Sequence, residues 1–260
     1  MIPNANRAQG VNSPAQGQPP ADLPTPHPVA PAQYASLSAN AGLLRIGCVF
    51  AVVGGYLDAF AYLAHGHVFA NTQTGNVVFL GLALAHADWL GAARHLPSIA
   101  AFAAGVTVAK LLGVKPEKHR FHATLLCQAI ELAALVALSL AGTRLPDHLI
   151  VPILAFVAAL QNTSFNRIGE WSFNSVMTTG NLLNALSGLV DWARRQQMPG
   201  SRDKALSLGA IILSFFLGAI AGGWFTLHSP PHALLPGVAL VALGVLLTLK
   251  ERAQALHPPA

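Results

Sequence analysis

Two short polar runs interrupt otherwise apolar sequence, and their residue types are suited to binding a small solute. The first polar segment is Asn-Thr-Gln-Thr-Gly-Asn at 71–76, and the second polar segment is Met-Thr-Thr-Gly-Asn at 177–181. Apolar residues of helical character follow each of them. A helix N-terminus has unpaired backbone N–H groups and partial positive charge, so inside a membrane it favours an anion or a polar carbonyl. Two such helix starts in one chain predict a paired binding site.

The Thr-Gly-Asn triplet shared by the two segments supplies most of the predicted solute contacts. The six residues are Thr74, Gly75, Asn76, Thr179, Gly180 and Asn181. A threonine can cap the helix that starts there, and a glycine permits backbone angles and close approaches that other residues resist. The alternative is a purely structural helix start, in which the two asparagines tie the preceding loops together.

A polar helix face precedes each segment. Asp58, Tyr62 and His65 lie at i, i+4 and i+7, so they share one side of a helix. Asn162, beside Gln161, adds polarity at the equivalent place in the second half of the chain. Ionisable groups inside a membrane usually face a cavity or a partner. Asp58 is therefore predicted to be either a proton or cation site, or a structural acceptor for the nearby loop.

Glu131 lies near the middle of an apolar stretch, with Gln128 one turn earlier. Removal from water disfavours a charged carboxylate, so a lone carboxyl there is either neutral or paired. Two hypotheses follow: a proton-coupling residue, or a hydrogen bond between helices.

No other arrangement in the sequence indicates catalysis. His65 and His67 could suggest a metal, but no Cys or carboxylate ligand accompanies them, which favours histidines at a membrane edge. There is no nucleophile elbow, phosphate loop, CxxC pair or dinucleotide fingerprint. We therefore expect no catalytic residue, no metal and no cofactor, and a protein that is not an enzyme.

The composition of the chain indicates that these residues lie in a membrane protein. The 260 residues are 53% hydrophobic and 10% charged, with a mean hydropathy of +0.50. Soluble proteins carry about 25% charged residues, so the chain is predicted to be a polytopic membrane protein. Its net charge of +5 fits basic cytoplasmic loops. The scattered Lys and Arg residues form no basic surface for nucleic acid.

Six apolar segments are judged long enough to cross a bilayer, which takes about 20 residues. They are 43–64, 97–113, 123–142, 149–166, 205–227 and 233–249. Two further segments, 68–87 and 171–192, contain the polar segments and are apolar only in their second halves. They are predicted to be re-entrant half-helices. The expected fold is an all-α membrane bundle of six spanning helices plus two re-entrant half-helices.

The basic residues support this topology, because short cytoplasmic loops collect Lys and Arg. With six crossings, only Arg94 and Arg144 lie on the outer side. With eight crossings, a strongly basic loop lies on the outer side with Lys110, Lys115, Lys118, Arg120 and Arg167. Six crossings with both termini in the cytoplasm are therefore preferred.

The order of segments indicates a duplication. Gly75 and Gly180 are 105 residues apart, and the same offset aligns Phe60 with Phe165. The unit of span, half-helix, span and span occurs twice and contains an odd number of crossings, so the second copy is inverted. Repeat one covers about 43–142 and repeat two about 149–250.

The remaining expectations concern the ends and the surroundings. Residues 1–40 are rich in Pro, Ala, Asn and Gln, contain no secretory signal, and are predicted to be a disordered tail. A single membrane domain covers 41–252, and a short tail covers 253–260. The expected partners are the lipid bilayer and a small polar or anionic solute; a homo-oligomer is compatible with the sequence.

The motif Gly-Gly-Tyr-Leu-Asp-Ala-Phe at 54–60, leading into the first polar segment, resembles the signature of the YoaK family. So does Gln-Asn at 161–162, followed by Thr-Thr-Gly-Asn at 178–181. The resemblance covers about 43–250. It implies a multi-pass protein of the bacterial inner membrane whose domain has no assigned function, and it supplies no substrate or catalytic residue.

Three functions remain open at this point. A transporter or channel needs polar residues that line one path to both faces. A membrane-embedded enzyme, using Asp58, His65 and Glu170, needs them clustered at one face. A scaffold or binding protein needs none of them to line a cavity. The duplicated polar segments favour the first.

Overall fold

The computed structural model describes residues 36–113, 117–142, 145–164, 167–168, 171–172, 178–194 and 200–256. These residues form eight α-helices, a 3-10 helix η3 (Pro230–His232), and a short antiparallel pair of strands, β1 (Arg167–Ile168) and β2 (Trp171–Ser172). The helices are α1 (Ser36–Ala64), α2 (Gln73–Ala85), α3 (Trp89–Gly113), α4 (Glu117–Ala141), α5 (Asp147–Ser164), α6 (Thr178–Ala193), α7 (Ser201–His228) and α8 (Leu235–Leu256).

Five stretches of the described helices are long and apolar enough to cross a membrane. They are Ala41–Ala64, Trp89–Leu112, Phe121–Ala141, Ser201–His228 and Pro230–Gln254. The predicted all-α membrane protein is therefore confirmed. The remaining predicted span, 149–166, corresponds to helix α5 as far as Ser164, and it is not among these five.

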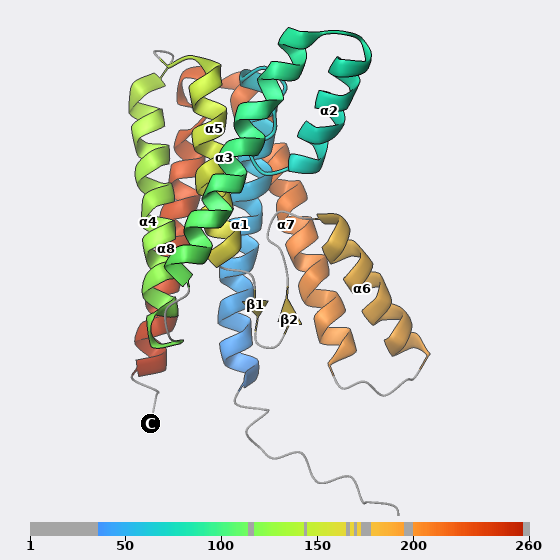
Figure 1. Ribbon diagram of the computed structural model, residues 1–260. Helices are drawn as coiled ribbons and strands as arrows, with labels where there is room; N and C mark the ends of the chain where they lie inside the picture. The colour runs from blue at the N-terminus through green and yellow to red at the C-terminus, as the bar shows by residue number, and fades with distance from the viewer. Residues whose placement is uncertain are drawn as a thin grey trace, which may run out of the picture.

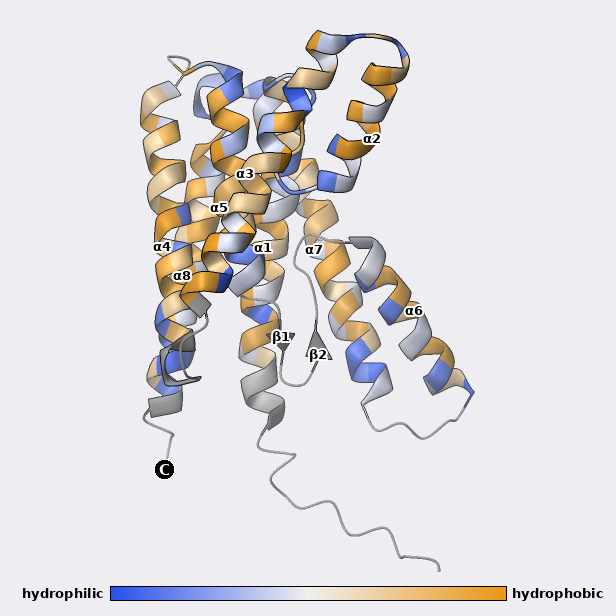
Figure 2. Cartoon of the chain, viewed as in Figure 1, coloured by the Kyte–Doolittle hydropathy of each residue, from blue (hydrophilic) through white to orange (hydrophobic). Residues whose placement is uncertain are grey.

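The outer surface of the bundle is apolar, as expected for helices that contact lipid. Exposed leucines include Leu140 on α4, Leu183 on α6 and Leu246 on α8. Figure 2 shows the hydrophobic colour on the outer faces of these helices. Large apolar faces of this kind mark contact with a membrane or a partner.

The centre of the bundle is formed by α1 and α5. Residues 150, 151, 154, 155 and 157–162 of α5 are all buried. Helix α1 packs chiefly against α7, and α3 chiefly against α5. Helix α4 packs against α5 and α8, while α8 also packs against α1. Figure 1 shows that α1 begins and α8 ends at the same end of the bundle.

The two helices that follow the polar segments are short and enter from opposite ends. Helix α2 has 13 residues and α6 has 16. At 1.5 Å per residue they are about 20 and 24 Å long, shorter than the roughly 30 Å hydrocarbon core. Figure 1 shows the N-termini of both helices directed toward the middle level of the bundle and their C-termini at opposite ends. Helix α2 packs against α3, and α6 packs against α7.

Glycines allow close helix contacts at equivalent places. A Cβ on Gly105 of α3 would collide with the backbone carbonyl of Phe156 on α5. A Cβ on Gly218 of α7 would collide with the backbone carbonyl of Val52 on α1. These are the α3–α5 and α1–α7 contacts, so both glycines permit close packing of the helices.

The ends of the domain differ from the expected boundaries. Helix α1 begins at Ser36, within the stretch assigned to the N-terminal tail, and α8 continues to Leu256. The rest of the expected tails, 1–35 and 257–260, lies outside the described residues.

Candidate functional site

Asp58 is a buried acceptor for the first polar segment. Its side chain is 4% exposed. Its Oδ1 accepts the backbone N–H of Asn71 at 2.6 Å, and its Oδ2 accepts the hydroxyl of Thr72. Asn71 in turn donates its side-chain N–H to the carbonyl of Gly54 at 3.2 Å. Of the two predicted roles, the geometry supports structural acceptor for the loop, because both carboxyl oxygens already have a donor.

Asn76 fixes the other side of the same loop. It is fully buried, accepts the backbone N–H of Phe69 at 2.9 Å, and donates to the carbonyl of Phe69 at 2.9 Å. Its amide also donates to Gln73 Oε1 at 2.9 Å and to the hydroxyl of Ser98 on α3 at 3.3 Å. The Ser98 hydroxyl donates to the carbonyl of Phe69 at 3.0 Å. The first polar segment is therefore bonded to α1 on one side and to α3 on the other.

The start of α2 shows that the predicted threonine cap is wrong. Helix α2 begins at Gln73 and its N-cap is Thr72, so Thr74 lies within the first turn, and its side chain is exposed. Thr72 makes no side-chain cap bond, and its hydroxyl donates to Asp58. The backbone N–H groups of Gly75 and Asn76 donate to the carbonyl of Thr72. These two backbone N–H groups at the start of α2 are therefore already bonded within the helix.

The glycines of the two triplets do not have positive φ angles. Among the described residues, Gly66, Gly142 and Gly200 have positive φ, whereas Gly75 and Gly180 do not. The expectation that Gly75 and Gly180 adopt angles closed to other residues is therefore wrong. Gly75 instead leaves room for the ring of Phe69, whose nearest atoms would be 2.8 Å from an added Cβ.

An aromatic cluster covers the first polar segment. The rings of Tyr62 and Phe69 stack with centroids 4.9 Å apart, and Phe69 and Phe79 stack at 6.2 Å. Phe79 stacks against His95 of α3 at 5.8 Å. His95 is buried, and its Nδ1 has no hydrogen-bond partner among the described residues. The residues of the predicted Asp58–Tyr62–His65 face therefore have different partners. Asp58 bonds to the loop, and Tyr62 packs on the ring of Phe69.

The second polar segment is more open than the first. Helix α6 begins at Thr178, 105 residues after the start of α2, which matches the predicted offset. Thr179 and Gly180 are exposed, and an added Cβ at Gly180 would meet nothing within 4 Å. Asn181 is buried, as Asn76 is. Thr179 lies inside the helix and is therefore not its cap; Met177 lies outside the described residues.

Asn162 occupies the buried, polar end of α5. Asn162 is 6% exposed and Gln161 is 1% exposed. Nearby, Thr124 of α4 donates its hydroxyl to the carbonyl of Ser164 at 3.1 Å. The polar end of α5 thus lies inside the bundle.

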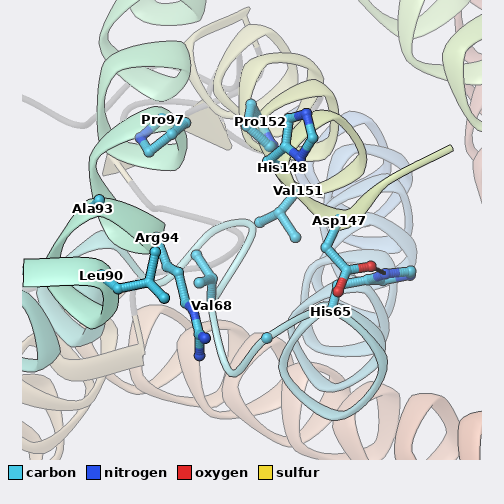
Figure 3. A pocket seen from close by; sticks show the side chains of 11 residues that line it. His65, Val68, Leu90, Ala93, Arg94, Pro97, Asp147, His148, Val151 and Pro152 are labelled. Carbon is cyan, nitrogen blue, oxygen red and sulfur yellow. Dashed lines mark hydrogen bonds and ion pairs between the residues drawn. The ribbon is translucent and has the colours of Figure 1, made fainter.

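A cavity of about 490 Å³ opens at the end of the bundle where α1 ends and α3 and α5 begin. Figure 3 shows Arg94 on one side of it, and His65, Asp147 and His148 on the other. His65 Nδ1 lies 2.8 Å from Asp147 Oδ1. Val68, which leads into the first polar segment, forms part of the wall.

Glu131 is buried without a hydrogen bond. It is fully buried in α4, and neither carboxyl oxygen has a partner among the described residues. The predicted bond between helices is instead made by Gln128, which donates from Nε2 to the Thr248 hydroxyl of α8 at 3.2 Å. Elsewhere in the described part of the chain, no three potential metal ligands come together.

Several residues of the site were not anticipated from the sequence. Ser98 and His95 belong to the first half of α3, and their spacing of i and i+3 places both on one helix face. That spacing is the signal that could have identified them. Arg94 was considered only for the topology and Asp147 was not considered, because nothing local in the sequence indicates that their helix ends meet.

These features define a class: a helical, multi-pass membrane protein with two short helices, each carrying a buried asparagine in its first turn. The chain belongs to a family whose model is described as "Protein of unknown function (DUF1275)", matched over residues 46–247. It is 29% identical over 217 residues to "UPF0700 transmembrane protein YoaK" of Bacillus subtilis (strain 168), covering 80% of this chain and 93% of that protein. The resemblance to the YoaK family is thus confirmed. No solved structure matches the chain.

Proposed function

We propose that the protein is a transporter or channel for a small polar or anionic solute, which passes between the N-termini of α2 and α6. The observation that carries the proposal is the arrangement of these half-helices, which enter from opposite ends and point their N-termini toward the middle level (Figure 1). Broken helices of this kind place substrate sites near the bilayer midplane in many transporters. The positive ends of the two helix dipoles favour an anion or a carbonyl oxygen there.

The proposal includes an inverted repeat that pairs α1 to α4 with α5 to α8. The packing supports it, because exchanging the two sets of helices converts the α1–α7 contact into α5–α3 and the α2–α3 contact into α6–α7. The contacts of α4 with α5 and of α8 with α1 also interchange. The close approaches at Gly105 and Gly218 fall on the interchanged pairs α3–α5 and α7–α1.

The proposed topology has six crossings, with α5 as the sixth and both termini in the cytoplasm of a bacterial inner membrane. Arg94, near the start of α3, then lies on the outer side. The charged start of α7 and the charged end of α8 lie on the inner side, in line with the distribution of Lys and Arg.

Within this path the two polar segments have different roles. The side chains of Asp58 and Asn76 are used in holding the loop, so they position α2. Thr179 and Gly180 are exposed at the start of α6. We therefore assign solute contact chiefly to Thr179 and Gly180 with the exposed Thr74, and support of the site to Asp58, Gly75, Asn76, Asn162 and Asn181.

The cavity beside Arg94 is the proposed outer entrance. Its lining contains one cation, Arg94, one acid, Asp147, and the imidazoles of His65 and His148, so a polar solute has several partners there. Its wall includes Val68, which precedes the first polar segment. No catalytic step and no cofactor are part of the proposal.

A second candidate is a membrane scaffold that transports nothing. The observation in its favour is that the polar groups of the first segment are largely satisfied by one another. The described cavity also lies at one end of the bundle, lined by residues that follow α1 and by the first halves of α3 and α5. A scaffold needs neither half-helix to contact solute.

Reconstitution into liposomes distinguishes the candidates. The probes are chloride, nitrate and glycerol, which represent small anions and a neutral polar solute. We expect at least one probe to cross faster than in empty liposomes, and Gly180→Val to abolish the difference by crowding the start of α6. Gly209→Val is the matched control, because Gly209 of α7 also has nothing within 4 Å of an added Cβ. Folded protein that passes none of the probes would favour the scaffold.

A further inference from the structure

Glu131 is the most isolated titratable group in the described part of the chain. Its side chain is fully buried on α4, and both carboxyl oxygens are without a hydrogen-bond donor. A buried charge without a partner is among the costliest arrangements in a protein, and more so inside a membrane. The surroundings therefore favour whichever form of the carboxyl carries no charge.

Gln128 lies one turn earlier on the same helix face and also has a buried oxygen without a hydrogen-bond donor. It is fully buried, and its Oε1 has no donor. Its Nε2 donates to the hydroxyl of Thr248 at 3.2 Å, and that hydroxyl donates to the carbonyl of Gly244 at 2.9 Å. Thr248 therefore cannot supply a proton to Gln128. Together, Glu131 and Gln128 present three buried acceptor oxygens with no donor.

The neighbouring helices supply no opposite charge. On α4 the nearest titratable group is Cys127, which is fully buried. The titratable residues of α5 are Asp147 and His148, at its far end. On α8 the first charged residue is Lys250, beyond Thr248, and it is exposed. On α3, which packs less closely on α4, Lys110 is exposed.

We propose that Glu131 is a proton-binding site within the membrane, where the carboxyl is held as the neutral acid. The bound proton gives this group of three oxygens one donor, and the acceptor that we assign to it is Gln128 Oε1, one turn away on the same helix face. Binding converts the carboxylate and a proton into the acid, with no other reactant. The site is separate from the half-helices and does not depend on the proposed transport of solute.

A proton fits this place better than a metal cation does. A cation needs a cavity and several oxygen ligands around it. Glu131 is instead packed beside Cys127 and Leu135, which are both fully buried. A proton needs neither space nor further ligands.

Infrared spectroscopy of the purified protein at neutral pH tests the proposal. We expect the stretching band of a protonated carboxyl group to be lost in Glu131→Gln and retained in Asp58→Asn, because the Asp58 carboxyl already receives two donors. Glu131→Gln should fold, since the amide has the shape of the neutral acid. A protonated-carboxyl band that is unchanged in Glu131→Gln, with loss of a carboxylate band instead, would overturn the proposal.

Chemical labelling gives a second readout that needs no variant. Dicyclohexylcarbodiimide is an apolar reagent that modifies protonated carboxyls in membranes, and peptide mass spectrometry locates the adduct. An adduct on Glu131 supports the proposal. Adducts on other carboxyls but none on Glu131, or a thermal stability that rises with sodium in wild type and not in Glu131→Gln, would contradict it and indicate a cation site.

Discussion

Helices α2 and α6 have the same place relative to the two polar segments but are held differently. Both α2 and α6 follow a polar segment, start 105 residues apart, and carry a buried asparagine as their fourth residue. The start of α2 is bonded to α1 through Asp58 and to α3 through Ser98. At α6, Thr179 and Gly180 are exposed, and the position equivalent to Asp58 is Thr163. The backbone plan is therefore common to both halves, while the first half-helix is a fixed support and the second has the open side chains.

The largest expected effect of a substitution is at Asp58. Asp58→Ala removes both acceptors from the buried N–H of Asn71 and the hydroxyl of Thr72. At about 1–3 kcal/mol for each unsatisfied buried group, we expect a loss of about 3 kcal/mol in unfolding free energy. Thermal unfolding in detergent measures it. Asp58→Asn keeps an acceptor and should accumulate in the membrane; loss of Asp58→Asn with tolerance of Asp58→Ala would contradict the assigned role.

A similar but smaller loss is expected at Asn76. Asn76→Ala leaves the backbone N–H and carbonyl of Phe69 without this partner, and we expect a loss of about 2 kcal/mol. Thr74→Ala is the matched control in the same helix turn, because Thr74 is exposed. Equal unfolding temperatures for the two variants would show that Asn76 does not hold the loop.

Substitution of Gly75 and Gly180 by alanine compares the packing at the starts of α2 and α6 directly. Gly75→Ala forces the new Cβ against the ring of Phe69 and should cost about 1–2 kcal/mol by overpacking. Gly180→Ala meets nothing and should be neutral or stabilising by up to about 1 kcal/mol, because alanine favours helix. The measurement is the unfolding temperature of each. A destabilised Gly180→Ala would mean that α6 is as tightly packed as α2.

The sequence predicted the two helix starts better than it predicted the bonds around them. The offset between Gly75 and Gly180 gave both helix starts, because a helix start is encoded locally by the residues around it. The cap by Thr74 was wrong, because the partner of Thr72 is Asp58 on the preceding helix. The cavity was missed because the ends of α1, α3 and α5, far apart in sequence, form it.

The smallest effect is expected at the entrance. His65 lies 2.8 Å from Asp147, whose side chain is 60% exposed. Exposed ion pairs contribute little, so His65→Gln should change the unfolding free energy by less than about 1 kcal/mol. If it costs as much as Asn76→Ala, measured in the same way, the pair is a structural tie between α1 and α5.

The central claim, that the half-helices enter from opposite faces, is tested most directly by cysteine accessibility. Single cysteines replace His86, at the end of α2, and Arg194, at the end of α6, in a protein whose Cys48 and Cys127 are changed to serine. A membrane-impermeant maleimide is applied to whole cells and to inverted vesicles. We predict that position 86 is labelled from outside, with Arg94→Cys, and position 194 from the cytoplasm, with Lys118→Cys. Labelling of positions 86 and 194 from the same face would contradict the inverted repeat and the solute path proposed between its halves.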